Sequence, residues 1–330
     1  MSTFTFSETY VAGSGMAVGP FEKKGPLGHY FTQAYADLYC GEKSFEKAEQ
    51  RLLRDAIEQS LSDAGIHPER VAMAVGGDLL NQGLISNYTM MDYPFPFVNV
   101  YGACSTSALA MGMACLLLNQ QNFNYTLAFT SSHYATAERQ FRFPNEYGAQ
   151  KKATTTTTVS GAGAIIFTKH PQPIKVISST FGKVVDWQFK DSANMGVAMA
   201  PAAYDTLLRH FKNTKTTFDD YDLILTGDLS KLGNAMLSDM LKKDGMDLKN
   251  KLNDCGLLIY DILHQNVFCG GSGCACSMVT MLSKGFDLLR QGKAKRILLV
   301  ATGALLTPVA LAQKGSIPCI AHAICFERSR

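Results

Sequence analysis

The chain repeats itself, and this repeat constrains the fold more than any other feature of the sequence. Four short strings of the first half return, in the same order, in the second half. They are GGDLLNQG (76–83) with TGDLSKLG (226–233), ACS (103–105) with ACS (275–277), LAFTSS (127–132) with LVATGA (299–304), and GAIIFTK (163–169) with HAICFER (322–328). One such pair arises easily by chance, but four in one order predict two similar halves, 1–172 and 173–330.

Within each half, helix patterns alternate with continuous apolar strands. After Ser44, the residues Phe45, Ala48 and Leu52 fall on one helical face, and Gly65 is placed to end that helix. Segments such as 125–132 and 160–169 are apolar throughout rather than at every second residue. This alternation is typical of an α/β fold with a parallel or mixed sheet that is covered on both faces. Two halves related by a pseudo-twofold axis also predict a cleft where they meet.

Charge and targeting signals exclude several classes of protein. The 31 Lys and Arg residues against 28 Asp and Glu residues give a net charge of +3, which does not indicate a nucleic-acid partner. The apolar run 107–118 is too short to span a membrane, and the N-terminal residues show no signal-peptide pattern. The nine cysteines are odd in number, so we expect reduced and mostly buried thiols.

Cys104 is the strongest candidate for chemistry. It follows a strand and the turn at Gly102, where a helix is expected to begin. The free amides and the dipole of a helix N-terminus stabilise a thiolate, so we expect a lowered pKa and a nucleophilic sulfur. The amides of residues 105–107 are equally suited to hold a ligand carboxylate. A small buried cysteine that only lets the helix approach the sheet is the structural alternative.

A base for Cys104 is missing from the places where the repeat would put it. A reactive cysteine requires a base and an oxyanion holder within reach. The matching positions of the second half hold no histidine; they hold Asp228, Ser272, Gly273, Cys274, Cys276 and Gly303. The second-half histidines are His210, His264 and His322, and none follows an echoed strand.

The other polar candidates point to anion binding or to packing. His133 follows the strand 125–132, and with Arg139 it could hold a carboxylate through charge-assisted bonds, unless this is merely a basic surface loop. The run CGGSGCACS (269–277) lacks the second ligand pair of a zinc site and is no dinucleotide fingerprint, so neither a metal nor a cofactor is expected. The five threonines 154–158 indicate an edge strand or a loop.

Longer strings give the chain a resemblance to a known family. The duplicated architecture with Cys104 at a strand-to-helix turn resembles the thiolase fold of thiolases and β-ketoacyl synthases. More narrowly, the whole chain resembles the stage V sporulation protein AD family of spore-forming bacteria. The strings that carry this resemblance are GGDLLNQ (76–82), FVNVYGACSTS (97–107), SSHYATAERQFRFPNEYG (131–148), DDYDLILTGDLS (219–230) and FCGGSGCACS (268–277).

The resemblance implies a five-layered αβαβα arrangement and a binding protein rather than an enzyme. Members of the family are understood to bind dipicolinic acid (pyridine-2,6-dicarboxylic acid) and to take part in loading it, with calcium, into the developing spore. They act beside membrane-embedded partners at the inner spore membrane, and thiolase-fold proteins commonly form homodimers. Cys104 matches the position of the thiolase-fold nucleophile, but the second-half histidine is not matched, which puts acyl transfer in doubt.

These considerations predict one site and leave two other functions open. We expect a small dicarboxylate between the helix start at 104–107 and the basic group of His133 or Arg139. The expected ligand-binding residues are Cys104, Ser105, Thr106, His133, Arg139, Asp228, Ser272, Cys274 and Gly303. The alternatives are an active acyltransferase that uses Cys104, and a scaffold whose pocket is vestigial.

Overall fold

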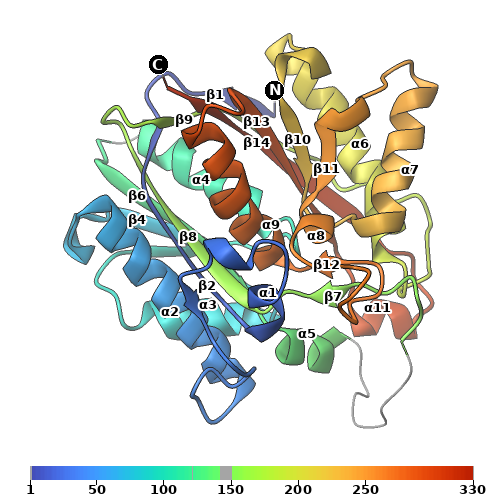
Figure 1. Ribbon diagram of the computed structural model, residues 1–330, viewed down its shortest axis with the longest axis horizontal. Helices are drawn as coiled ribbons and strands as arrows, with labels where there is room; N and C mark the ends of the chain where they lie inside the picture. The colour runs from blue at the N-terminus through green and yellow to red at the C-terminus, as the bar shows by residue number, and fades with distance from the viewer. Residues whose placement is uncertain (1, 121, 142–150, 330) are drawn as a thin grey trace.

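The computed structural model describes residues 2–120, 122–141 and 151–329. Its central feature is one continuous path of paired strands, which bends around a pair of buried helices (Figure 1). The first half of the chain supplies five main strands in the order β5-β4-β6-β8-β2. Their bounds are β2 (Tyr10–Val18), β4 (Met73–Gly77), β5 (Phe97–Asn99), β6 (Tyr125–Ser132) and β8 (Gly161–Thr168).

The second half repeats this order and these strand directions. Its main strands run β11-β10-β13-β14-β9, and β9 meets β2 at the pair Tyr10 and Lys175. Their bounds are β9 (Ile174–Phe181), β10 (Leu223–Thr226), β11 (Leu252–Asp254), β13 (Arg296–Ala304) and β14 (Cys319–Arg328). In each half, the three strands farthest from the junction of β2 and β9 are parallel to one another. Each of the two strands nearer that junction is antiparallel to its neighbours within the half. Three of the four echoed pairs fall on equivalent strands or at their ends, namely β4 with β10, β6 with β13 and β8 with β14. The fourth pair differs, because ACS (103–105) lies in the turn before the helix Thr106–Gln120, whereas ACS (275–277) lies within the helix Cys274–Thr280.

Long helices cover the outer faces of the two strand sets. In the first half, α2 (Phe45–Ala64) begins where the Ser44 hydroxyl accepts a hydrogen bond from the Lys47 amide at 3.3 Å, and it ends at Gly65, whose φ is 63°. It packs on β2, β6 and β8, beside α3 (Leu84–Met90). In the second half, α6 (Met195–Thr214) packs on β9, β13 and β14, with α7 (Ser230–Lys243) against it.

Two helices lie between the strand sets and are buried. The first, α4 (Thr106–Gln120), contacts β4 and β6 of one half and β13 and β14 of the other. It meets α9 (Cys274–Thr280), and the hydroxyls of Ser107 and Ser277 are 2.6 Å apart. A π-helical turn (Met281–Gly285) leads from α9 into α10 (Phe286–Arg290).

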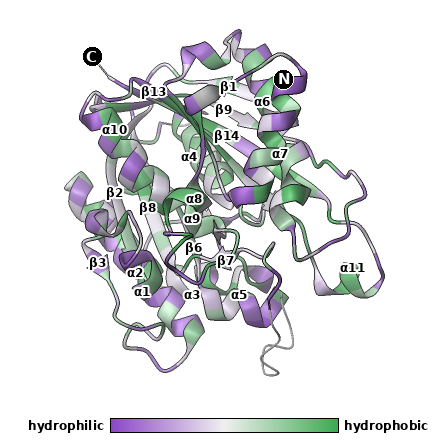
Figure 2. Cartoon of the chain, turned by 45° about the vertical axis from the view of Figure 1, so that its right-hand side comes forward, coloured by the Kyte–Doolittle hydropathy of each residue, from purple (hydrophilic) through white to green (hydrophobic). Residues whose placement is uncertain are grey.

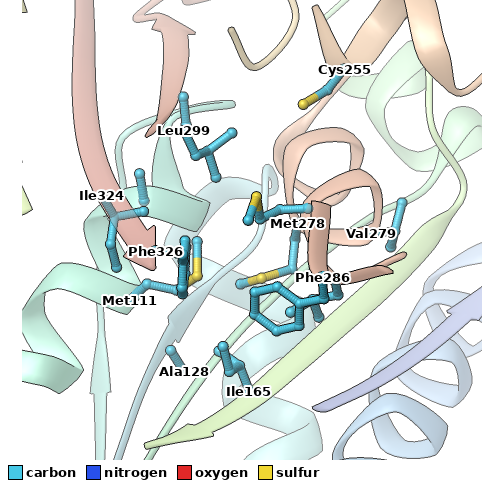
Figure 3. Packing of buried hydrophobic residues seen from close by; sticks show 14 of the residues in the cluster. Met111, Ala128, Ile165, Cys255, Met278, Val279, Phe286, Leu299, Ile324 and Phe326 are labelled. Atoms are coloured by element: carbon cyan, nitrogen blue, oxygen red, sulfur yellow. The ribbon is translucent and has the colours of Figure 1, made fainter. Parts of the chain in front are cut away.

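The central core joins the two halves. Figure 3 shows Met111 of α4 and Met278 of α9 among apolar strand residues such as Ile165 and Leu299. Separate cores lie under α2 and under α6. The layers are thus helix, sheet, helix, sheet and helix, which is the expected five-layered α/β arrangement.

Short elements complete the fold around the ends of the strands. Among them, β7 pairs with β12 and so ties residues of the first half to residues of the second. In Figure 2, α11 projects from the body of the molecule, within the connection between β13 and β14. The remaining bounds are β1 (Thr3–Thr5), β3 (Gln33–Ala34), β7 (Thr157–Thr158), β12 (Gly271–Ser272), α1 (Pro20–Lys23), α5 (Tyr134–Phe141), α8 (Cys255–Leu258) and α11 (Pro308–Ala312).

Two further findings concern the cysteines and the helices. All nine cysteines are free, and all but Cys104 are buried. Within the described ranges, no helix is long and apolar enough to cross a membrane.

Candidate functional site

A cavity of about 940 Å³ lies where the two halves meet. Both halves line it, as the repeat predicts, and its walls combine apolar side chains with three cations and a row of threonines. The lining side chains that matter below are Phe45, Tyr101, Cys104, Tyr134, Glu138, Arg139, Phe141, Lys151, Lys152, Thr155, Thr156, Thr158, Asp228, Ser272, Leu306 and Leu311.

Cys104 faces this cavity from a tight turn between β5 and α4. The preceding Ala103 has a φ of 50°, and the helix begins at Thr106 rather than at the cysteine. The amides of Ser105 and Thr106 donate to the carbonyl oxygens of Gly102 and Ala103 at 3.1 and 3.2 Å. Their hydroxyls donate to the same two oxygens at 2.6 and 2.7 Å. The expectation that these two amides hold a ligand carboxylate is therefore wrong, because the turn itself uses them.

The predicted fall in the pKa of Cys104 is also wrong. Burial raises the pKa of the thiol well above its ordinary value, and the neighbouring carboxylate of Asp228 raises it further. The Gly273 amide acts in the opposite direction, but its effect is smaller. Cys104 is accordingly a neutral thiol at physiological pH and a weak nucleophile.

This electrostatic arrangement predicts slow alkylation of Cys104. At pH 8 we expect iodoacetamide to modify it at least tenfold more slowly than free cysteine, since each unit of pKa changes the thiolate fraction about tenfold. Asp228→Asn removes the adjacent negative charge and should raise the rate several-fold, as followed by peptide mass spectrometry. Asp254→Asn, which changes a buried carboxylate bonded to Thr226, Leu229 and Ser230, is the control. Alkylation at the rate of free cysteine would contradict this assignment.

Asp228 is held rigidly beside the thiol. It follows β10, and its carboxylate accepts hydrogen bonds from the Thr302 hydroxyl at 2.7 Å and from the Gly273 amide at 3.1 Å. Burial is the main cause that raises its pKa to about 6, so the carboxylate is mostly ionised at neutral pH. A second negative charge is thus disfavoured at this end of the cavity.

Gly303 supports the Cys104 turn from behind. A Cβ atom at this position would lie 2.1 Å from the Gly102 carbonyl oxygen. The residue is therefore required for close backbone approach and does not line the cavity. Cys274 is also outside the lining, since its thiol donates to the Ser131 carbonyl oxygen at 2.8 Å.

His133 belongs to the packing around the cavity. Its Nε2 lies 2.8 Å from the Leu38 carbonyl oxygen, and its ring stacks on Phe45. Burial lowers its pKa to about 4, so the ring is neutral and supplies no charge for an anion. Of the predicted site residues, Cys104, Arg139, Asp228 and Ser272 line the cavity, whereas Ser105, Thr106, His133, Cys274 and Gly303 do not.

The second-half histidines are placed elsewhere. His210 forms hydrogen bonds with the hydroxyls of Thr180 and Tyr221 in the core under α6. His322, which is on β14, accepts a hydrogen bond from the Gly182 amide through its Nδ1 atom. His264 is exposed and pairs with Asp261. Within the described part of the chain, no histidine lines the cavity that holds Cys104.

Two of the three cations that line the cavity, Lys151 and Lys152, were not predicted from the sequence, whereas Arg139 was. Lys151 donates to the Tyr134 hydroxyl at 2.7 Å and pairs with Glu138 at 3.0 Å. Lys152 pairs with Asp191 at 3.5 Å, and Arg139 with Glu46 at 3.1 Å. The one feature of the sequence that could have indicated these lysines is their adjacency, as the pair Lys151-Lys152, to the threonine run 154–158 in a polar insertion of the first half. Residues 142–150, the end of one string of the family resemblance, lie outside the described residues.

The threonine run has a definite place. As expected, it contains an edge strand, since Thr157 and Thr158 form β7 beside Gly271 and Ser272 of the second half. Thr155, Thr156 and Thr158 line the cavity, which the sequence did not indicate. The strand pair thus closes one side of the cavity across the two halves.

Fold and cavity together define the class: a thiolase-fold protein whose cysteine turn faces a carboxylate instead of a histidine. OleA from Xanthomonas campestris, in a variant form, has a TM-score of 0.63 with 14% identity, over 97% of this chain and 99% of that one. The 3-oxoacyl-[acyl-carrier-protein] synthase III from Aquifex aeolicus has a TM-score of 0.57 with 12% identity, over 97% and 99% of the two chains. At such identities the likeness concerns the fold alone, and it confirms the predicted thiolase-like fold.

Sequence similarity identifies the family within this class. Residues 1–327 match the family described as Stage V sporulation protein AD (SpoVAD). The Stage V sporulation protein AD of Bacillus subtilis (strain 168) is 48% identical over 320 residues, which are 97% of this chain and 94% of that protein. The chain belongs to the Stage V sporulation protein AD family, a family of sporulation proteins.

Proposed function

We propose that this protein binds pyridine-2,6-dicarboxylate in the cavity between its halves, without transforming it, and takes part in its uptake into the spore. The observation that carries the proposal is the composition of the cavity wall. The thiol of Cys104, which lines the cavity, is kept neutral by burial and by Asp228, no histidine is present in the described lining, and three cations are part of that lining. Such a wall is suited to hold a small acid and poorly suited to acyl chemistry.

The ligand carboxylates are expected at the cations and not at the cysteine turn. Lys151 is the most enclosed of the three, with 19% of its side chain exposed against 52% for Arg139 and 68% for Lys152. Its charge is the least screened by water, so it contributes most to the binding of an anion. The pyridine ring would then lie against apolar walls such as Phe141, Leu306 and Leu311.

Titration calorimetry with dipicolinate tests this proposal. We expect saturable 1:1 binding by the purified chain, measured with and without calcium to establish whether the metal enters with the ligand. Picolinate, which has one carboxylate, should bind at least tenfold more weakly, since it loses a charge-assisted contact. Equal affinities for picolinate and dipicolinate would contradict the pose, and no binding of dipicolinate would contradict the function.

Membrane-embedded proteins of the uptake system are the proposed partners, with the protein peripheral at the inner spore membrane of the forespore. This part of the proposal is supported by membership of the sporulation family. A pull-down from detergent-solubilised sporulating cells tests it. The proposal fails if membrane proteins of the uptake system do not copurify with the tagged chain.

We also propose that the chain forms a homodimer through β5. This strand is at one end of the strand path, and Val98 on it is exposed, as are Met91 and Tyr101 in the segments that precede and follow the strand. A second copy related by a twofold axis would pair its β5 antiparallel to this one and cover the apolar side chains. Light scattering should give about twice 36.0 kDa for the parent chain and the monomer mass for Val98→Lys. Val184→Lys, at another exposed site, is the control, and a monomeric parent chain would contradict the dimer.

A further inference from the structure

A second cavity of about 370 Å³ lies beside the first. Tyr134, Lys151 and Thr158 line both cavities and form the partition between them. The other lining side chains that matter here are Phe21, Glu22, Ser160, Tyr260, Asn266 and Phe268. Nothing in the proposed binding of a dicarboxylate uses this second space.

Glu22 is an incompletely satisfied carboxylate in the wall of this cavity. The residue is 1% exposed. Its Oε1 accepts hydrogen bonds from the Tyr260 hydroxyl and, at 2.9 Å, from the Ser160 amide. Its Oε2 is buried and has no hydrogen-bond partner among the described residues. A buried carboxylate oxygen without a donor is costly, so the site is short of one hydrogen-bond donor.

Desolvation of this carboxylate supports the same conclusion. Burial raises the pKa of Glu22 to about 7, against the lowering effect of hydrogen bonds from the Tyr260 hydroxyl, the Ser160 amide and the backbone amide of Glu22 itself. The one cation in the described lining, Lys151, is already paired with Glu138 and bonded to Tyr134. At neutral pH Glu22 is therefore only partly ionised, and no described cation forms an ion pair with its charged form.

The walls of the cavity are aromatic. Phe21, Tyr134, Tyr260 and Phe268 contribute rings, and the described lining contains no carboxylate besides Glu22. Aromatic faces with one buried carboxylate are suited to an organic ammonium group, because both attract a positive charge. A metal ion is less suited, since the described residues contain no group of three or more His, Cys, Asp or Glu side chains that could hold one.

We propose that this second cavity binds a small organic cation, a primary amine on a flat apolar body, with its ammonium group held by the Glu22 carboxylate. The aromatic rings cover the body of the ligand, and Asn266 lies at the exposed rim. The shared partition places this ligand next to the dicarboxylate site, but its binding does not depend on that site being occupied.

Benzylamine and benzyl alcohol are the probes, since they share the ring and differ in charge. In titrations followed by ligand-observed NMR, we expect saturable binding of benzylamine and at least tenfold weaker binding of benzyl alcohol. Glu22→Gln keeps the acceptor for Tyr260 and Ser160 and removes the charge, so it should weaken benzylamine at least tenfold. Phe21→Ala, at a half-exposed position of the wall, should weaken benzylamine binding several-fold. This variant provides the test if Glu22→Gln fails to fold.

Asp228→Asn is the control for location, because it removes a carboxylate from the first cavity only, and it should leave benzylamine binding unchanged. The proposal is overturned if Glu22→Gln binds benzylamine as the parent chain does, or if the alcohol binds as well as the amine. It is also overturned if Asp228→Asn abolishes benzylamine binding while Glu22→Gln does not. None of these outcomes depends on whether dipicolinate binds.

Discussion

Replacing Lys151 by methionine is expected to weaken dipicolinate binding about 10- to 100-fold, as measured by titration calorimetry. A hydrogen bond to a charged group contributes about 1.5–3 kcal/mol, and each 1.4 kcal/mol changes the dissociation constant tenfold. The effect should exceed that of Arg139→Met or Lys152→Met, because those two cations are more exposed and more screened. The methionine keeps much of the length and apolar stem of the lysine.

Two comparisons separate lost binding from a damaged fold. Lys151→Met leaves the buried Glu138 without this cation, so Lys151→Met with Glu138→Gln removes both charges together. Lys183→Met, which affects a surface pair with Asp205, is the matched control and should bind dipicolinate normally. Affinities within twofold of the parent chain for Lys151→Met would exclude this lysine from the site.

The second large effect is expected from Gly303→Ala. The added Cβ would lie 2.1 Å from the Gly102 carbonyl oxygen and 3.1 Å from the Ser105 amide nitrogen, so the turn that holds Cys104 must move. Overpacking of this kind costs about 3 kcal/mol, and we expect the melting temperature to fall by roughly 5 °C. Binding of dipicolinate should weaken as well, because the displaced turn changes the shape of the cavity.

Gly315→Ala provides the comparison for Gly303→Ala. At this position the Cβ atom is 3.1 Å from its nearest neighbour, the Ala310 carbonyl oxygen, in a more open part of the chain. Differential scanning calorimetry should show a shift of at most about 1 °C for this variant. An equally small shift for Gly303→Ala would mean that the two halves do not approach at the Cys104 turn as described.

The architecture could be predicted from the sequence because it is encoded twice. Strings such as GGDLLNQG and TGDLSKLG fall at the ends of β4 and β10, which have equivalent places in the two strand sets. Local signals also sufficed for α2, whose cap at Ser44 and stop at Gly65 lie where the pattern indicates. The repeat and the end signals of α2 can both be recognised in a single sequence, because neither depends on contacts between distant residues.

The chemistry of the site was harder to predict because it depends on contacts between the halves. A cysteine before a helix suggests a stabilised thiolate, but Asp228 from the other half lies against this thiol, and burial removes its water. His133 looked available for a ligand, yet the Leu38 carbonyl oxygen, far away in the sequence, holds its ring. The importance of Lys151 depends on its enclosed position in the cavity wall and on its pairing with Glu138, and neither is apparent from its neighbours in the sequence.

Intact-protein mass spectrometry after incubation with an acyl-coenzyme A tests the central claim that the cavity binds and does not react. We expect an unchanged protein mass and no release of coenzyme A at neutral pH, because the thiol is protonated and the described cavity lining contains no histidine. An acyl adduct located on Cys104, with one coenzyme A released per chain, would contradict it and establish an acyltransferase.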